Sequence, residues 1–248
     1  MNRSRIAIPE PSSLDQSYSS RNWPLYAAAV ESAGGEPVLI SLSTSQAEIA
    51  ATIAACQGVL LPGSGADINP SRYGERLNGS NLADPAREAA DELLLQDAFN
   101  LRKPLLGICY GFQSMNVWLG GSLIQDLPTQ KPSPVAHGRI RGQLPPPHPI
   151  NIVEGSRLSS LAGTSQVAVN SSHHQAAARL GDGLRVVATC PEDDIVEAAE
   201  MRGSSFAIGV QWHPERDYGD NAFSQRIFAV LVEAAGVWRP IPNTVSGS

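Results

Sequence analysis

The sequence predicts an α/β protein with a mostly parallel, helix-covered sheet and a β-rich second half. Up to about residue 120, short apolar runs alternate with helical stretches, which is the pattern of strand–helix units in a parallel sheet. After about residue 150, β-like runs follow one another with few helices between them. The 248 residues are 42% hydrophobic and 17% charged, which suits one large globular domain and excludes disorder driven by charge.

The first half divides into strands and the helices that follow them. The first helix stops at Gly34-Gly35, because glycine tolerates the left-handed backbone that helix ends favour. Asp84-Pro85 is typical of an N-cap followed by proline in the first helical turn. The expected strands are 5–8, 37–40, 58–61 and 104–108, and the expected helices are 23–33, 47–55 and 85–102.

The second half begins with a long excursion, 131–149, that is rich in Pro, Gly and His. One helix and several β-like runs follow it, and a polar tail starts at about Asn243. No repeat, low-complexity block or clear linker divides the chain, so we expect residues 1–248 to form a single domain. The expected strands are 150–153, 166–169, 184–189, 195–199 and 206–210, and the expected helix is 222–235.

Charge and targeting signals narrow the class of partner. Lys and Arg number 18 against 24 Asp and Glu, which gives a formal net charge of −6. An acidic chain argues against nucleic acid or an anionic membrane as the main partner. No apolar stretch approaches the roughly 18–20 residues of a membrane span, and Ile6-Ala7-Ile8 is too short for a signal-peptide core. We therefore expect a cytoplasmic protein that binds a small molecule, with no nucleic-acid or membrane partner.

The number and spacing of the cysteines also favour a cytoplasmic protein. Cys56, Cys109 and Cys190 are odd in number and far apart, so a disulfide framework is not expected. The sequence has no CxxC motif and no Cys/His zinc spacing. His173-His174 could form a metal pair, but no third ligand has a recognisable spacing. We therefore expect neither a metal nor another cofactor.

The strongest local signal is the segment 107–111, Gly-Ile-Cys-Tyr-Gly, between a buried strand and a helix. Glycines two residues before and after Cys109 permit the sharp turn of a nucleophile elbow. We expect the helix N-terminus to favour the thiolate form of Cys109. The amide of Tyr110 would point at a developing oxyanion. The alternative, that Cys109 is a small buried core residue, stays open on the elbow alone.

A thiolate nucleophile needs a base, and the base needs a group that orients it. His213 follows an apolar strand, and Pro214 breaks that strand, so His213 and Glu215 can project from one loop. The carboxylate two residues on could hold the imidazole in the useful tautomer. The other histidines lie in turn-like or Pro-rich segments and are interpreted as surface or structural residues: His137, His148, His173 and His174.

A third segment, Pro62-Gly63-Ser64-Gly65, is a small-residue loop after a strand and could present a second amide to an oxyanion. It matches neither the Walker loop nor GxGxxG. Together with the cysteine elbow, three stretches resemble the class I glutamine amidotransferase-like superfamily, and most of all its gamma-glutamyl-gamma-aminobutyrate hydrolases. They are PGSGADINPSRYGE (62–75), NSSHHQ (170–175) and GVQWHPE (209–215), and the resemblance covers about 6–235.

The resemblance implies a three-layer αβα sandwich with a flavodoxin-like core and a Cys-His-Glu triad of Cys109, His213 and Glu215. Cys109 would attack a gamma-glutamyl amide, and water would cleave the resulting thioester to release glutamate and an amine. This activity would belong to polyamine or putrescine catabolism. The resemblance also implies an oxyanion site at the amides of Tyr110 and of Gly63-Ser64. The residues matching positions that cradle the glutamyl head group are Gln113, Asn170, Ser171 and His173.

Two departures bear on substrate preference. Tyr110 stands where many members carry arginine, and Ser64 stands where many carry a second glycine. Two other functions also stay open. One is a glutaminase subunit that delivers ammonia to a partner synthase, and the other is a non-catalytic thiol sensor. Neither the leaving amine nor the oligomeric state follows from the sequence, and a homodimer is one of the open assemblies.

Overall fold

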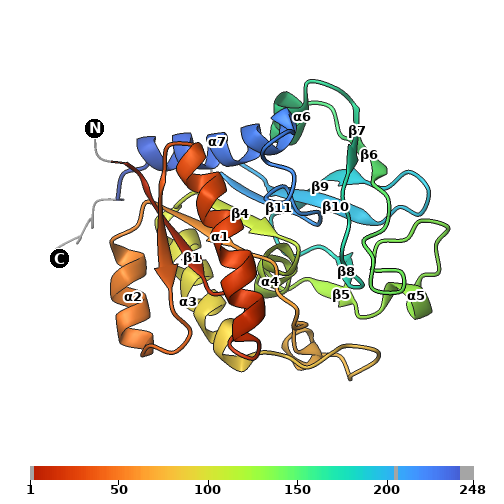
Figure 1. Cartoon of the computed structure of the whole chain (residues 1–248), viewed down its shortest axis with the longest axis horizontal. Helices are drawn as coiled ribbons and strands as arrows, with labels where there is room; N and C mark the ends of the chain where they lie inside the picture. The colour runs from red at the N-terminus through yellow and green to blue at the C-terminus, as the bar shows by residue number, and fades with distance from the viewer. Residues whose placement is uncertain (1–2, 204–205, 241–248) are drawn as a thin grey trace, which may run out of the picture.

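The computed structural model describes residues 3–203 and 206–240, and it confirms the predicted α/β class. A nine-stranded sheet has the order β2-β1-β3-β4-β11-β10-β9-β6-β7 (Figure 1). Neighbours from β2 to β11 are parallel, and neighbours from β11 to β7 are antiparallel. The strands are β1 (Arg5–Pro9), β2 (Glu36–Ile40), β3 (Gly58–Leu61), β4 (Leu105–Ile108), β6 (His148–Ile152), β7 (Gln166–Val169), β9 (Leu184–Thr189), β10 (Val196–Met201) and β11 (Ala207–Val210).

Helices cover both faces of this sheet. The helices α1 and α7 pack together on one face, whereas α2, α3 and α4 cover the other. A separate antiparallel pair, β5 (Ser122–Ile124) and β8 (Ala176–Arg179), lies beside α4. The helices are α1 (Gln16–Ser32), α2 (Gln46–Ala54), the 3₁₀ helix η1 (Pro70–Tyr73), α3 (Pro85–Leu101), α4 (Tyr110–Trp118), α5 (Leu127–Gln130), α6 (Arg157–Ala162) and α7 (Ala222–Val237).

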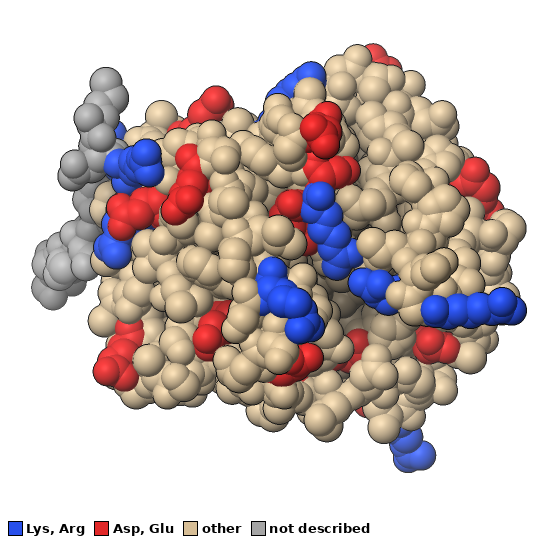
Figure 2. Space-filling model, in the orientation of Figure 1, with Lys and Arg blue, Asp and Glu red and all other residues tan. Residues whose placement is uncertain are grey.

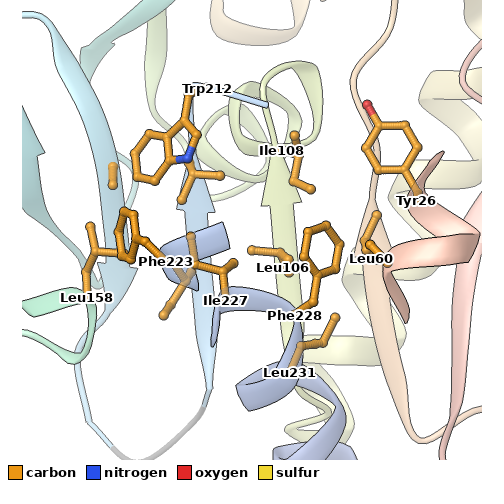
Figure 3. Close-up of a cluster of buried hydrophobic side chains, with 14 of the residues drawn as sticks. Tyr26, Leu60, Leu106, Ile108, Leu158, Trp212, Phe223, Ile227, Phe228 and Leu231 are labelled. Carbon is orange, nitrogen blue, oxygen red and sulfur yellow. The ribbon is translucent and has the colours of Figure 1, made fainter. Parts of the chain in front are cut away.

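The larger core lies between the sheet and the α1/α7 face (Figure 3). Side chains of α7 point at the central strands β4 and β11, and Trp212 stacks on Phe223 with ring centroids 5.9 Å apart. Burying one large apolar side chain contributes about 1.5–3 kcal/mol, so this layer fixes the ends of those strands. The side chains of the cluster labelled in the figure are Tyr26, Leu60, Leu106, Ile108, Leu158, Trp212, Phe223, Ile227, Phe228 and Leu231.

The structure corrects the predicted start of the first helix. The helix α1 begins at Gln16 rather than at residue 23, because the Asp15 side chain accepts a hydrogen bond from the Tyr18 amide at 2.8 Å and caps it. Pro24 therefore lies inside the helix. Short elements with little periodicity were not predicted from the sequence: α5, α6, η1, β5 and β8.

The arrangement of the strands places the candidate site. In the adjacent parallel strands β4 and β11, Ile108 is in register with Val210, and the Cys109 amide donates to the Val210 carbonyl at 2.8 Å. Their carboxyl ends therefore lie side by side. Within the described chain, no helix is both long and apolar enough to cross a membrane. The polar tail predicted from Asn243 falls outside the described residues.

Candidate active site

Cys109 occupies a strained turn between β4 and α4. Its backbone has φ 51° and ψ −107°, a conformation that costs a non-glycine residue about 1–3 kcal/mol and that clusters at functional sites. The two flanking glycines make the turn possible. A Cβ at Gly107 would lie 2.8 Å from the Gly111 carbonyl oxygen, and a Cβ at Gly111 would lie 2.1 Å from the Leu61 carbonyl oxygen. The chain can therefore turn from strand to helix within one residue.

The helix that follows directs its free amides toward the cysteine. The first amides of an α-helix have no partner within the helix, so they can donate to a negative charge beside its N-terminus. The side chain of Tyr110 turns inward, is 1% exposed and lies under the guanidinium of Arg87 at 4.7 Å from the ring centroid. The sequence departure at Tyr110 thus places a buried aromatic ring beneath the site, while its backbone stays at the helix start.

His213 follows β11 and is held by two residues. Its Nδ1 lies 2.7 Å from Oε1 of Glu215, and both side chains are buried. Asn170 holds the histidine backbone on both sides, because the His213 amide donates to Oδ1 at 3.0 Å and Nδ2 donates to the His213 carbonyl at 2.9 Å. The ring and its backbone are thus both fixed. Cys109 is among the groups that raise the pKa of the imidazole.

The electrostatics of the histidine favour its charged form. Burial lowers the pKa of His213, but the charges of Glu215 and Cys109 and the hydrogen bonds to them outweigh burial and raise that pKa to about 9. Burial raises the pKa of Glu215, but the attraction of His213 prevails and lowers it below its usual range. At neutral pH the pair is therefore an imidazolium beside a carboxylate. This arrangement can donate a proton to a leaving group and can stabilise a thiolate.

The loop after β3 packs against the histidine ring. A Cβ at Gly63 would lie 2.9 Å from Cε1 of His213, so only glycine permits this approach. The Gly63 amide donates to the Tyr26 hydroxyl at 3.0 Å, and Ser64 is the residue of this pair that lines the pocket. The buried Arg87 fixes the loop by donating to the Pro62 carbonyl at 2.7 Å.

A cavity of about 280 Å³ opens over Cys109. Figure 2 shows a hollow on this face with basic side chains at its rim, and Arg139 and Arg216 are among the residues that line the cavity. Asp67 and His174 form a second charged group in its wall, with Oδ1 and Nε2 2.9 Å apart. The pocket therefore offers both positive and negative groups to a polar ligand.

The structure brings most of the predicted site residues to this cavity, but not all. Cys109, His213, Ser64, Tyr110, Gln113 and His173 line it. Gln113 is buried and donates to the Gln175 carbonyl at 3.1 Å and to Oε1 of Gln211 at 3.2 Å. Gly63, Asn170, Ser171 and Glu215 lie behind the wall, where Ser171 donates to the His137 carbonyl at 2.8 Å. These four support the lining residues, in contrast to the head-group contact expected of Asn170 and Ser171.

Sequence reasoning missed several residues of the cavity wall. Arg139 belongs to the excursion 131–149, to which no site residue was assigned, and it lines the cavity. Tyr18 is a residue of α1. Burial is the main cause that raises the pKa of Tyr18 to about 12, so the phenol stays protonated. Of the missed residues, only Asp67 had a signal in the sequence, because this charged residue lies close to the small-residue loop Pro62-Gly63-Ser64-Gly65. Nothing in the spacing of Tyr18, Arg139 or Arg216 indicates that they meet.

The sequence and the fold of this chain are both similar to those of known proteins. The family model described as Peptidase C26 matches residues 10–215. Gamma-glutamyl-gamma-aminobutyrate hydrolase PuuD of Escherichia coli K12 is 34% identical over 84% of this chain and 84% of its own length. A Mycobacterium tuberculosis protein assigned as a glutamine amidotransferase is 34% identical over 85% of this chain, and the match spans 66% of that longer protein. In fold, the chain is similar to the crystal structure of a Thermoplasma acidophilum protein assigned as a GMP synthase subunit, with a TM-score of 0.67, 14% identity and coverage of 95% and 96%.

Proposed function

This chain belongs to the Peptidase C26 family of class I glutamine amidotransferase-like hydrolases, and from that premise we propose that it hydrolyses gamma-glutamyl amides through a thioester on Cys109. The observation that carries the proposal is the arrangement of side chains at the carboxyl ends of β4 and β11. A strained cysteine at a helix N-terminus shares a pocket with His213, whose Nδ1 contacts the Glu215 carboxylate at 2.7 Å. A cysteine that served only as a core residue would need neither His213 nor Glu215 beside it.

The proposed reaction has two steps. The Cys109 sulfur attacks the side-chain carbonyl carbon of the gamma-glutamyl group, the C–N bond breaks, and His213 gives its proton to the departing amine. Water then attacks the thioester, His213 accepts a proton from that water, and the C–S bond breaks to release glutamate and the thiolate. The amides of Tyr110 and Ser64 would hold the oxyanion in both steps, and one such donor is worth about 10²–10³ in turnover.

The charges of the pocket suit a substrate with several charged groups. The guanidiniums of Arg139 and Arg216 can bind carboxylates, which they match in geometry. The carboxylate of Asp67 can bind the glutamyl ammonium. Gamma-glutamyl-aminobutyrate carries two carboxylates and one ammonium, and the similarity to PuuD favours a substrate of this kind. We therefore propose that the leaving amine also carries a carboxylate.

A glutaminase that supplies ammonia to a synthase is the second candidate, favoured by the similarity to the M. tuberculosis protein assigned as a glutamine amidotransferase. Incubation of the chain alone with gamma-glutamyl-aminobutyrate and with glutamine separates the two. We expect glutamate release from gamma-glutamyl-aminobutyrate, with little from glutamine. Ammonia release from glutamine that requires a synthase would favour the second candidate.

Acid quench followed by mass spectrometry tests the nucleophile. We expect a glutamyl adduct on the peptide that contains Cys109, and loss of both adduct and turnover in Cys109→Ala. Cys56→Ala is the matched control, because Cys56 is a buried core cysteine outside the pocket. Full turnover in Cys109→Ala, with no adduct in the unaltered chain, would refute the proposed mechanism.

A further inference from the structure

Three buried histidines surround one carboxylate oxygen beside the active-site pocket. Oε1 of Glu197 lies 3.2 Å from Nδ1 of His137, 3.5 Å from Nε2 of His148 and 3.6 Å from Nε2 of His173. The four residues are at most 5% exposed. They come from four separate segments: the 131–147 loop, β6, the 170–175 segment and β10. Only the fold brings them together, which is why no spacing in the sequence indicated this cluster.

The outer nitrogen of each histidine already has a partner. Nε2 of His137 lies 2.8 Å from the Asp193 carboxylate, Nδ1 of His148 lies 3.1 Å from the Pro149 carbonyl, and Nδ1 of His173 lies 2.9 Å from the Gln175 carbonyl. Oxygens of this kind accept hydrogen bonds, so each neutral ring carries its proton on the outer nitrogen. Such outer partners are the usual way in which proteins orient metal-binding histidines.

The inner nitrogens consequently turn their lone pairs toward a carboxylate. Nδ1 of His137, Nε2 of His148, Nε2 of His173 and both oxygens of Glu197 are buried without a hydrogen-bond partner. A buried polar atom without a partner costs about 1–3 kcal/mol, and more when it is charged. Several lone pairs that meet at one anionic oxygen add repulsion to that cost. A cation bound to His137, His173 and Glu197 would satisfy one ligand atom of each of these three residues at once.

The ligand atoms of His137, His173 and Glu197 all lie within 4.8 Å of one another, so one small ion can reach all three. Zinc binds imidazole nitrogen and carboxylate oxygen at about 2.0–2.2 Å, so neighbouring ligand atoms around a tetrahedral ion lie about 3.3–3.6 Å apart. The distances from Oε1 of Glu197 to Nδ1 of His137 and to Nε2 of His173, 3.2 and 3.6 Å, bracket this range. Imidazole nitrogens favour zinc over magnesium and calcium, which prefer oxygen ligands.

We propose that His137, His173 and Glu197 bind one Zn²⁺ ion. The three ligands are at most 4% exposed and do not include Cys109, and we assign the ion a structural rather than a catalytic role. A neighbouring group, Cys190 with Asp193, lies on the outer side of His137. Its atoms are already paired, because Cys190 donates to Glu192 and Asp193 accepts from Ser133 and His137.

The zinc ion would fix one wall of the active-site pocket. Gly138 and Arg139 directly follow His137 and line the pocket, as His173 does. The metal would tie this wall to β10 of the central sheet, which carries Glu197. It would therefore set the position of Arg139 without taking part in the chemistry at Cys109. The proposal is independent of the hydrolase function, because metal content can be measured without any substrate.

The first test uses the full chain, purified with a non-histidine tag from zinc-supplemented medium. We expect about one zinc per chain by elemental analysis, and a lower melting temperature after removal of zinc with a chelator, restored by added zinc. Glu197→Gln and His137→Gln should lose most of the metal. His174→Gln is the matched control, because His174 is the neighbour of His173 but contacts Asp67 and Asp126 instead, and it should keep the metal.

A milder pair of variants tests the outer shell. Asp193→Asn removes the charge that orients His137 and should weaken zinc binding by about 10–100-fold. Asp194→Asn makes the same change at an exposed neighbour with φ 56°, which asparagine tolerates, and should leave zinc affinity unchanged. Equal affinities for the two variants would contradict the assignment of the outer shell.

Cobalt substitution tests the proposed metal site in the unaltered chain, so its result does not depend on whether a variant folds. Tetrahedral Co²⁺ in the unaltered chain should give intense visible d–d bands that zinc abolishes. Purified chain that contains no zinc, does not bind added zinc and gives no such bands would overturn the proposal. The cluster would then be a protonated imidazolium–carboxylate network.

Discussion

Asn170 clamps the backbone of His213, accepting from its amide at 3.0 Å and donating to its carbonyl at 2.9 Å. The two residues lie 43 positions apart. Asn170 was expected to contact substrate, but it does not line the cavity. Its position makes it a positioning residue that sets where the imidazole stands relative to Cys109. The structure thus assigns this part of the NSSHHQ stretch to support of the site.

Asn170→Asp should reduce kcat with little change in KM. The substitution loses the donor to the His213 carbonyl and sets a carboxylate beside Asp217, whose Oδ2 lies 3.4 Å from Nδ2 of Asn170. Misplacement of a catalytic group by about 1 Å costs about 10²-fold in rate. Steady-state kinetics measure the effect, with the exposed Asn151→Asp as control. A raised KM at unchanged kcat would instead indicate that Asn170 binds substrate.

Activity should fall as the pH rises through about 9, because His213 then loses the proton that the leaving amine needs. The folded-state pKa is raised above the ordinary value of about 6.5. The stabilisation from this pair is therefore complete below about pH 6.5 and is lost as the pH rises through about 9. Profiles of kcat/KM and of melting temperature against pH measure both effects.

Glu215→Gln tests the cause of this shift. Removal of the carboxylate should lower the pKa of His213, so the alkaline limb of the activity profile should move to lower pH. Maximal turnover should also decrease, since the imidazole loses its orienting partner. An alkaline limb that stays in place would show that Glu215 does not set the protonation of His213.

Gly63→Ala should impair turnover far more than stability. The added methyl group would lie 2.9 Å from Cε1 of His213 and 3.1 Å from the Tyr26 hydroxyl, so the ring has to move. We expect a loss of about 10²-fold in kcat/KM, the size seen for small misplacements of catalytic groups. Gly65→Ala is the matched control, because its methyl group would meet nothing closer than Cε2 of Tyr18 at 4.0 Å. Equal losses of kcat/KM in both variants would show that turnover depends on the loop as a whole rather than on the contact between Gly63 and the His213 ring.

Arg87→Leu should destabilise the chain by about 3–5 kcal/mol, because it leaves Asp91 buried and unpaired. Their ion pair measures 2.7 Å, and both side chains are at most 1% exposed. Arg87→Leu with Asp91→Leu should recover part of the loss, but not the hydrogen bonds to Pro11 and Pro62. Urea unfolding measures these free energies. Arg72→Leu breaks an exposed pair with Glu92 and should cost less than about 1 kcal/mol, so a similar cost for both would contradict the argument.

Much of the secondary structure followed from local sequence. Apolar runs gave strands β1 to β4 within one or two residues, and Asp84 caps α3 as expected, accepting from the Arg87 amide at 3.2 Å. The start of α1 was wrong, because a cap at Asp15 lies eight positions before the residue at which the helix was expected to begin. Short pairings such as β5 with β8 depend on contacts between distant segments, which periodicity does not report.

The sequence by itself determined the α/β class, the tight turn at Cys109 and the pairing of His213 with Glu215, because each depends on residues close together in the chain. Only the tertiary structure decided that Asn170 lies behind His213, that Arg139 lines the pocket, and that His137, His148 and His173 meet at Glu197. The physical reason is that strand order and loop packing set these distances. Sheet neighbours such as β4 and β11, about a hundred residues apart in the chain, bring together groups that no local pattern connects.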